Sequence, residues 1–468
     1  MIGLVIAASA GGAPAAHAAP DRAGADRAGA DLAGGCASVP ACYTPQQLRA
    51  AYGLRPLLDR GIDGRGETVV LPEQGEQQAT PPSVTDIRQD LAGFDRRFHL
   101  PAARLAVTTT LARGASRWLA LQEETLDVEM VHAVAPAAAI RVILLPSSAM
   151  VSAPALTAAL TRAVRLGTSL GDVISLSMGV GEHCFSGAEV TRMHEQLQAA
   201  GRHHVTVVAA SGDTGAVGGA CPAPFSVPGV VPVVEPLLPA ADPQVLAVGG
   251  TSLDASHRTG AYIGESGWSQ PLQNLEVDTL ASGGGFSRLF ARPAYQDGVP
   301  GIGRLRAVPD VAADASGATG LALVAADGQG RYAISGSSGT SAAAPFWAGL
   351  VAEADQLAGH DLGFINPALY GIARGPDYHL AFHDVVRGNS TVVVAPGRFP
   401  GYRAGPGWDP VTGWGSPDAQ LLVPLLARYP GYCPRAATWA HPPWLICDNG
   451  GRATHARSDP RRPEGAVA

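Results

Sequence analysis

The segment with the strongest chemical signal is Ser338–Pro345, which reads Ser-Gly-Thr-Ser-Ala-Ala-Ala-Pro and precedes an apolar run. A serine at a junction between a loop and a helix has an exposed hydroxyl, and the positive end of the helix favours an oxyanion that develops beside it. Pro345 would fit the first turn of this helix, where its missing N–H costs nothing. Serine and threonine also cap helices without any catalytic role, but this string is more specific than a cap. We therefore expect Ser341 to be a nucleophile.

Two acidic residues four positions apart, Glu123 and Asp127, lie in a segment from Trp118 to Val134 with helical spacing of its apolar residues. On a helix this spacing places both carboxyl groups on one face. Two neighbouring carboxyl groups can share a proton, which separates their pKa values. Charged residues on a helix more commonly form a solvated face, but the serine string favours the catalytic interpretation.

A third polar string, Ser211-Gly-Asp-Thr-Gly215, follows the apolar run Val205–Ala210. Taken alone, Asp213 could be an ordinary turn residue. Together the three strings resemble the sedolisin family of serine-carboxyl peptidases, which have a subtilisin-like fold. Subtilisins carry their catalytic histidine in a His-Gly-Thr context, which this chain lacks.

The resemblance assigns a role to each of four residues. It implies that Ser341 is the nucleophile, that Glu123 is its base and that Asp127 orients Glu123. It also implies that Asp213 donates a hydrogen bond to the oxyanion. Asp213 must then be protonated, because a carboxylate would repel an oxyanion. The expected reaction is peptide hydrolysis through an acyl-enzyme at about pH 3–5, from the reference pKa values of Asp and Glu.

Two less specific strings also resemble sedolisin segments that lie near the substrate. Ser177, Met178 and Gly179 would line the substrate cleft, and Ser282–Ser287 (SGGGFS) resembles another sedolisin loop near the active site. Glycine-rich strings are more often simple turns, so these assignments are less specific than the serine string.

A second resemblance lies near the C-terminus, where Phe382–Val385 and Gly405–Gly415 are similar to the sedolisin calcium site. It implies two carboxylates and three backbone carbonyls as ligands of one structural Ca²⁺. These are Asp384, Val385, Gly405, Gly407 and Asp409. Calcium takes about 6–8 oxygen ligands, so water would complete the shell. The alternative is a surface loop rich in glycine and proline.

The elements that must position these residues alternate along the chain. Apolar runs predict strands at 68–71, 140–145, 173–178, 205–210, 245–248 and 321–324, and helical spacing predicts helices at 118–134, 156–166, 187–201 and 342–358. Strands that are apolar throughout indicate a mostly parallel sheet flanked by helices on both faces, an α/β fold that the resemblance makes subtilisin-like. Ligands bind such sheets at the carboxyl ends of the strands, where Ser177, Asp213 and Ser341 are expected.

The N-terminus and the cysteines indicate a secreted, extracellular protein. Residues 1–18 combine a short apolar run with an Ala-His-Ala ending, which predicts a signal peptide. An even number of cysteines after a signal peptide favours disulfides. The pairs that close local loops are Cys36–Cys42, Cys184–Cys221 and Cys433–Cys447. Reduced structural thiols are the alternative.

Four regions are expected along the chain: a signal peptide at 1–18, a low-complexity linker at 19–35, one peptidase domain at 36–427 and an extension at 428–468 with a disordered tail from 451. Sedolisins usually carry a large N-terminal prodomain, and only 19–42 separate the predicted cleavage site from Tyr43, where the resemblance begins. Either the gene start is misplaced or the enzyme folds without a prodomain.

Composition excludes several classes of function. The net charge is −7, with 46% hydrophobic and 16% charged residues, which is typical of a globular protein and not of a nucleic-acid binder. No later apolar stretch is long enough for a membrane span. We expect a monomer that acts on peptides or proteins, without nucleic-acid or membrane partners. The alternatives are a secreted binding protein on the same scaffold and a neutral subtilisin-type peptidase that uses one of the 13 histidines.

Overall fold

A computed structural model of the chain describes residues 42–75, 85–110, 119–120, 122–146, 152–218, 221, 233–271, 279–326, 332–394, 397–429, 446–447 and 453–454. The predicted signal peptide and linker lie outside these ranges, as do Cys36, Cys433 and most of the C-terminal extension. The helices are α1 (Pro45–Ala51), α2 (Arg55–Leu58), α3 (Ile87–Phe98), α4 (Gln122–Val134), α5 (Ala153–Gly167), α6 (Gly187–Arg202), α7 (Thr340–Ala358), α8 (Asn366–Ala373), α9 (Tyr378–Ala381) and α10 (Ala419–Arg428), with 3₁₀ turns η2 (Glu182–Cys184) and η3 (Ala294–Gln296).

The strands are β1 (Thr68–Gly75), β2 (Thr85–Asp86), β3 (Arg104–Thr109), β4 (Leu119–Ala120), β5 (Ala139–Pro146), β6 (Val173–Leu176), β7 (Val180–Gly181), β8 (Thr206–Ala210), β9 (Val217–Gly218), β10 (Val233–Val234), β11 (Leu237–Leu238), β12 (Leu246–Ala255), β13 (Tyr262–Gly267), β14 (Ser269–Pro271), β15 (Thr279–Ala281), β16 (Gly285–Ala291), β17 (Leu305–Val308), β18 (Val311–Asp314), β19 (Ala322–Ala326), β20 (Tyr332–Gly336), β21 (Phe382–His383), β22 (Val392–Val394), β23 (Gly397–Phe399), β24 (Ser416–Pro417), β25 (Ile446–Cys447) and β26 (Ala453–Thr454).

A central sheet organises the molecule, with the strand order β13-β12-β8-β6-β1-β5-β3 and with β18 also paired to β12. Every pair in this sheet is parallel except β12 with β13. The expected mostly parallel α/β sheet is therefore confirmed.

Successive side chains of a strand point to opposite sides of the sheet. Both sides of this sheet are covered, so the apolar side chains of its strands are buried on both faces. In β1, Val69 and Leu71 belong to one core and Val70 to another. In β5, Val142 and Ile143 divide in the same way. One sheet therefore separates two hydrophobic cores, which explains why its strands do not alternate between apolar and polar residues.

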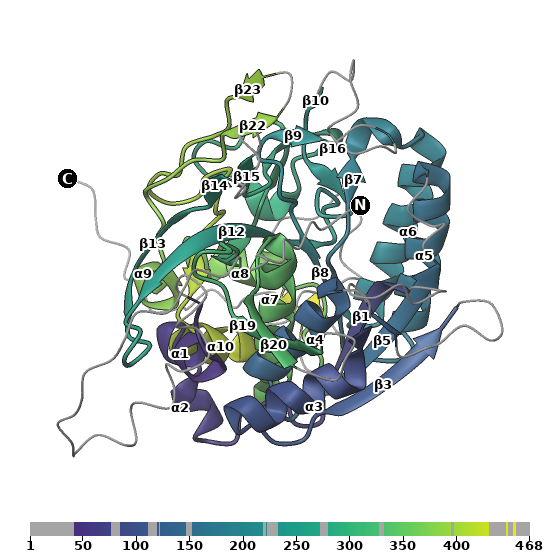
Figure 1. Ribbon diagram of the computed structural model, residues 1–468. Helices are drawn as coiled ribbons and strands as arrows, with labels where there is room; N and C mark the ends of the chain where they lie inside the picture. The colour runs from purple at the N-terminus through teal and green to yellow at the C-terminus, as the bar shows by residue number, and fades with distance from the viewer. Residues whose placement is uncertain are drawn as a thin grey trace, which may run out of the picture.

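Helices cover each face of the sheet, as expected (Figure 1). Helices α5 and α6 pack together, and their apolar residues belong to the smaller core. The other face carries α4 and α7, which pack against each other in the larger core that runs from Cys42 to Leu426. No helix in the described part of the chain is long and apolar enough to cross a membrane.

Three expectations about local structure need correction. The helix expected from Trp118 begins only at Gln122, because 119–120 pair with 85–86 as a short antiparallel ladder. The helix that carries Ser341 begins at Thr340 and not at 342, so Pro345 lies inside it, beyond the first turn. Within the tail expected to be disordered, 453–454 pair with 446–447.

Candidate active site

Two helices that pack face to face carry the expected nucleophile and carboxylate pair. Glu123 and Asp127 lie in the first half of α4, and Ser341 is the second residue of α7, with 4% of its surface exposed. Their close packing depends on Gly349, where a Cβ would lie 2.8 Å from the Cβ of Val134. The contact between α4 and α7 brings together residues that are more than two hundred positions apart in the sequence.

The Ser341 hydroxyl and the Glu123 carboxylate are in contact. Both Glu123 oxygens are buried and form no hydrogen bond of ordinary geometry with a described residue, but the Ser341 hydroxyl is close enough to favour the ionised carboxylate. Burial and the negative charge of Asp127 outweigh that contact, and they hold the pKa of Glu123 well above its usual range. A serine hydroxyl facing a carboxylate of raised pKa is the arrangement of a nucleophile and its base.

Pro345 has a specific consequence at this position. A residue four positions after Ser341 in a helix would normally donate its N–H to the Ser341 carbonyl, and proline has no N–H. The Ser177 hydroxyl lies 3.4 Å from that carbonyl oxygen. Because Pro345 donates no hydrogen bond, the Ser341 carbonyl can accept one from the loop that follows β6.

Asp127 is fully buried and its carboxylate has two partners. Its Oδ2 accepts a hydrogen bond of 2.6 Å from the Ser177 hydroxyl, and it interacts with the Glu73 carboxyl group. Burial raises the pKa of Asp127 to about 7, although these two hydrogen bonds oppose the shift. The hydroxyl of Ser177 is therefore directed at the Asp127 carboxylate.

Glu73 is a member of this network that the sequence reasoning missed. It is 2% exposed and lies in β1, an interior strand of the sheet between β6 and β5. Burial and the charge of Asp127 hold its pKa well above its usual range, which favours the protonated form, whose O–H can donate a hydrogen bond to Asp127. An acidic residue near the carboxyl end of an otherwise apolar strand was the available signal.

Asp213 lies beside the start of α7, as expected for an oxyanion donor. Its Oδ1 accepts hydrogen bonds of 2.8 Å from both the backbone N–H and the hydroxyl of Thr340. The other oxygen, Oδ2, faces Gly339, where a Cβ would lie only 2.7 Å from it and where φ is +93°. Burial raises the pKa of Asp213 despite the two hydrogen bonds. The arrangement leaves the Oδ2 oxygen of Asp213 available for a hydrogen bond near Ser341, the expected nucleophile.

The Ser282–Ser287 loop packs directly against the Asp213 segment. Gly283 donates its N–H to the Gly212 carbonyl at 2.7 Å, and a Cβ on Gly283 would lie 2.2 Å from the Ser211 carbonyl oxygen. Met178 packs its side chain in the smaller core, and Gly179 lies against the backbone of Leu238. The roles of Ser177, Met178 and Gly179 at the substrate cleft remain predictions.

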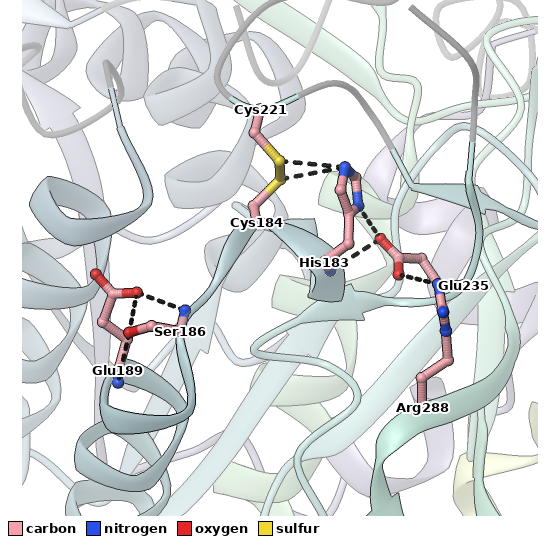
Figure 2. Close-up of a disulfide and its surroundings, with 7 residues drawn as sticks. All are labelled: His183, Cys184, Ser186, Glu189, Cys221, Glu235 and Arg288. Carbon is pink, nitrogen blue, oxygen red and sulfur yellow. Dashed lines mark hydrogen bonds and ion pairs between the residues drawn. A yellow bond between two sulfur atoms is a disulfide. The ribbon is translucent and has the colours of Figure 1, made fainter.

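A disulfide links the loops that follow Ser177 and Asp213. Cys184 and Cys221 are bonded, which confirms this predicted pair, with Cα atoms 5.4 Å apart. Figure 2 shows the His183 ring between the disulfide and the buried carboxylate of Glu235, with its Nε2 3.2 Å from Cys221 Sγ. Cys42 is also disulfide-bonded. Its pairing with Cys36 and the pairing of Cys433 with Cys447 stay predictions, because Cys36 and Cys433 lie outside the described residues.

The loop with the predicted calcium ligands brings both carboxylates together. Asp384 accepts a hydrogen bond from the N–H of Gly407, and Asp409 Oδ2 accepts one from Gly405, each 3.1 Å long. Among the described residues, none donates a hydrogen bond to the carbonyls of Val385, Gly405 or Gly407. A Cβ on Gly405 would meet nothing within 4 Å. Two carboxylates and three unpaired carbonyls are a donor set that fits Ca²⁺.

Comparison with known proteins identifies the relatives of this chain. The model of the subtilase family matches residues 107–363. Kumamolisin from Bacillus sp. (strain MN-32) is 34% identical over 404 residues, which cover 83% of this chain and 65% of that relative. Tripeptidyl-peptidase 1 from Homo sapiens is 32% identical over 279 residues, 55% of this chain and 44% of the relative. The chain thus spans less than two thirds of the length of these relatives.

Among solved structures, Pseudomonas sedolisin, a serine-carboxyl proteinase complexed with two molecules of pseudo-iodotyrostatin, matches with a TM-score of 0.66 and 25% identity. That match covers 82% of this chain and 98% of the sedolisin chain. The subtilase model covers more than half of the chain, and the most extensive of these sequence and structural matches are to serine-carboxyl peptidases. The chain therefore belongs to the sedolisin family, on the subtilisin-like fold.

Proposed function

We propose that the chain is a secreted serine-carboxyl peptidase that hydrolyses peptide bonds at acid pH. The observation that carries this proposal is the contact of the Ser341 hydroxyl with the buried Glu123 carboxylate, which Asp127 faces from the same helix. The Cys184–Cys221 disulfide supports an extracellular location, because disulfides persist in oxidising compartments.

The proton of the nucleophile moves to Glu123. Glu123 accepts it as Ser341 Oγ attacks the peptide carbonyl, and the same carboxyl group returns it to the leaving amine. The charge of Asp127 raises the pKa of Glu123. The hydrogen bonds from Ser177 and Glu73 lower the pKa of Asp127 and so favour its ionised form. Water then hydrolyses the acyl-enzyme by the same proton transfers in reverse.

The tetrahedral oxyanion is held by neutral Asp213. Thr340 anchors Oδ1, so that the proton on Oδ2 points toward the start of α7 and can be donated. The helix dipole of α7 adds a positive end at the same place. The hydrogen bond from Asp213 requires its carboxyl group to be protonated, which restricts the reaction to acid pH.

A pH–rate profile tests this assignment. With a denatured protein or a peptide mixture as substrate, we expect a bell-shaped profile with its maximum in the acid range. Its lower limb would come from the first ionisation of the Glu123–Asp127 pair, after which the two carboxyl groups share one proton, and its upper limb from Asp213. In Asp213→Asn the amide donates at every pH, and its oxygen can still accept from Thr340. This variant should therefore lose the upper limb, even if its overall rate is lower. A maximum near neutrality in the unmodified chain would contradict the carboxyl assignment, and no turnover at any pH would favour a binding protein.

The C-terminal loop would hold a structural Ca²⁺. Its ligands would be the carboxylates of Asp384 and Asp409 and the carbonyls of Val385, Gly405 and Gly407. The ion would fix this loop against β18, since Trp414 donates its N–H to the Asp310 carbonyl and Ala312 donates to the Gly415 carbonyl. It takes no part in the chemistry.

Removal of calcium should lower stability through this loop. A ligand bound only to the folded state stabilises it by about 2.7 kcal/mol at a hundredfold excess over Kd. Addition of a chelator at pH 6 is therefore expected to lower the melting temperature by several degrees, and Asp409→Asn should show a smaller change. An equal response to chelator in Asp409→Asn and in the unmodified chain would show that this loop does not hold the ion.

A further inference from the structure

The disulfide between Cys184 and Cys221 lies at the surface, in the loops that follow Ser177 and Asp213. Cys184 is the last residue of η2, and Cys221 lies three residues after the end of β9. The Cys221 side is exposed, and Cys184 is partly exposed. A small molecule in solution can therefore reach this bond.

The ring of His183 lies directly beside both sulfur atoms (Figure 2). Its Nε2 is 3.2 Å from Cys221 Sγ and 3.9 Å from Cys184 Sγ, so it can form a hydrogen bond with either sulfur. The shorter of the two distances is the one to Cys221. A proton on Nε2 is therefore better placed for transfer to Cys221 than to Cys184.

The buried carboxylate of Glu235 fixes the orientation of this ring. Glu235 is 2% exposed, and its Oε1 accepts a hydrogen bond of 3.1 Å from the backbone N–H of His183 and also contacts the ring Nδ1. An ionised carboxylate only accepts hydrogen bonds, so Nδ1 is the donor in this contact. In the imidazolium form both ring nitrogens carry hydrogen, and Nε2 then donates toward the disulfide.

Glu235 is itself held by the two loops and by one arginine. Arg288 Nη1 lies 3.7 Å from its Oε2. A Cβ on Gly181 in β7 would lie 2.6 Å from Oε1, and a Cβ on Gly218 in β9 would lie 2.7 Å from it. The backbones of β7 and β9 therefore close around the carboxylate. The pair of His183 and Glu235 is built into the start of both loops that the disulfide joins.

This arrangement has the parts that thiol–disulfide exchange needs. In such an exchange a thiolate attacks one sulfur of a disulfide, and the other sulfur leaves as a thiolate. A sulfur leaves faster when its developing negative charge is stabilised, and a neighbouring histidine cation does so. Because Nε2 is closer to Cys221, the geometry assigns Cys221 as the leaving sulfur and Cys184 as the sulfur that is attacked.

We propose that the Cys184–Cys221 disulfide is a site of exchange with low-molecular-weight thiols, and that His183 directs the exchange by protonating Cys221. The sulfur of the small thiolate bonds to Cys184 Sγ as the bond between Cys184 and Cys221 breaks. Cys221 Sγ takes the electron pair and the Nε2 proton, and water returns a proton to the ring.

The products of this first step are a mixed disulfide on Cys184 and a free thiol on Cys221. A second small thiol can then attack the mixed disulfide, which releases Cys184 as a thiol and the two small molecules as their own disulfide. The two electrons that reduce the protein thus come from two molecules of the small thiol, which are oxidised.

Exchange would open the covalent link without removing the pairing that holds both loops at their start. Strand β7 pairs with β11, and β9 pairs with β10. We therefore expect the exchanged chain to stay folded. Its melting temperature should be lower, because the disulfide restricts the unfolded chain across a sequence separation of 37 residues.

The competing explanation is an exposed disulfide that reacts with thiols without any help from the ring. That explanation predicts the same rate of exchange when the imidazole is removed. It also predicts that the small thiol is found on both cysteines, since nothing would select the leaving sulfur. Rate and position are therefore the two quantities to measure.

The test exposes the folded full chain to 2-mercaptoethanol at pH 6, where histidine can supply a proton and a small thiol still supplies some thiolate. Free thiols are trapped at short times with N-ethylmaleimide, and peptide masses locate both labels. His183→Asn keeps an amide nitrogen near the position of Nδ1 for Glu235, but it places no proton donor beside the sulfur atoms. His203→Asn, at an exposed histidine, is the matched control.

In the unmodified chain we expect 2-mercaptoethanol on Cys184 and N-ethylmaleimide on Cys221. In His183→Asn the disulfide should be lost more slowly by about tenfold or more, and the labels should be divided between the two cysteines. The control should match the unmodified chain in both respects. A melting curve of each variant before exchange checks that it is folded.

The proposal is overturned if folded His183→Asn loses the disulfide as fast as the unmodified chain does. It is also overturned if the unmodified chain carries 2-mercaptoethanol on Cys221, or on both cysteines equally. The second measurement uses the unmodified chain alone, so it decides the matter even if His183→Asn does not fold.

Discussion

Ser341→Ala is expected to reduce peptide turnover by about 10³-fold or more while the melting curve stays close to that of the unmodified chain. The hydroxyl is the group that would attack the substrate, and it faces the Glu123 carboxylate. Alanine fits the position without strain, since Ser341 lies in a helix and is followed by alanines. Turnover is measured at the acid optimum, and folding by the thermal transition.

Glu123→Gln should cause a loss of similar size, because an amide cannot accept the proton of the nucleophile. The neighbouring Glu124→Gln is the register control, since Glu124 is also buried on α4. We expect the control to retain most of its turnover per folded molecule. The opposite pattern, with Glu124→Gln inactive and Glu123→Gln active, would show that the wrong carboxylate had been assigned as the base.

The second large effect concerns the stability of the whole fold, which we expect to fall as pH rises from about 4 to 7. Asp314 shows the cause: it is 5% exposed, and burial raises its pKa to about 7. Glu129 and Glu353 are fully buried acids whose pKa values burial also holds well above the usual range. Several acids in the folded chain are therefore neutral at acid pH.

The direction follows from proton binding in the two states. The unfolded chain has an ordinary Asp pKa of about 3.9, so near pH 5–6 the folded state binds a proton at Asp314 that the unfolded state has released. The stabilising contribution is complete below about pH 4 and is lost as pH approaches the folded pKa of about 7. Between about pH 4 and about pH 7, each such group lowers the unfolding free energy by about 1.4 kcal/mol for each unit by which the pH rises.

Denaturant titrations at a series of pH values, at constant calcium, measure this slope. In Asp314→Asn the slope should be smaller by about one proton, since the amide does not titrate and its oxygen can still accept the hydrogen bonds from Leu253 and Thr319. Exposed Asp254→Asn is the matched control and should leave the slope unchanged. A stability that increases steadily from pH 4 to 7 would contradict the effect of the buried acids.

Local patterns in the sequence were sufficient for the class of fold and for the separate parts of the site. Apolar strands such as Thr68–Leu71 and Val205–Ala210 indicated a parallel sheet covered on both faces, because a strand buried on two sides needs apolar residues at every position. The spacing of Glu123 and Asp127 placed both on one helix face, which is a property of the helix alone. The string around Ser341 marked the start of a helix, although the exact start came two residues earlier.

Contacts between distant segments, and the pKa values they produce, were decided only by the tertiary structure. Glu73 reads as one acid at the end of a mostly apolar strand, and it joins the carboxyl groups of Glu123 and Asp127 only because β1 ends beside α4. Nothing in the sequence indicated that the hydroxyl of Ser177 is hydrogen-bonded to Asp127, a contact that depends on how the loop after β6 packs. The contact of His183 with Glu235 has no sequence signal, since the two residues are 52 positions apart. Helix and strand periodicity act over a few residues, whereas burial and charge proximity depend on where the whole chain is packed.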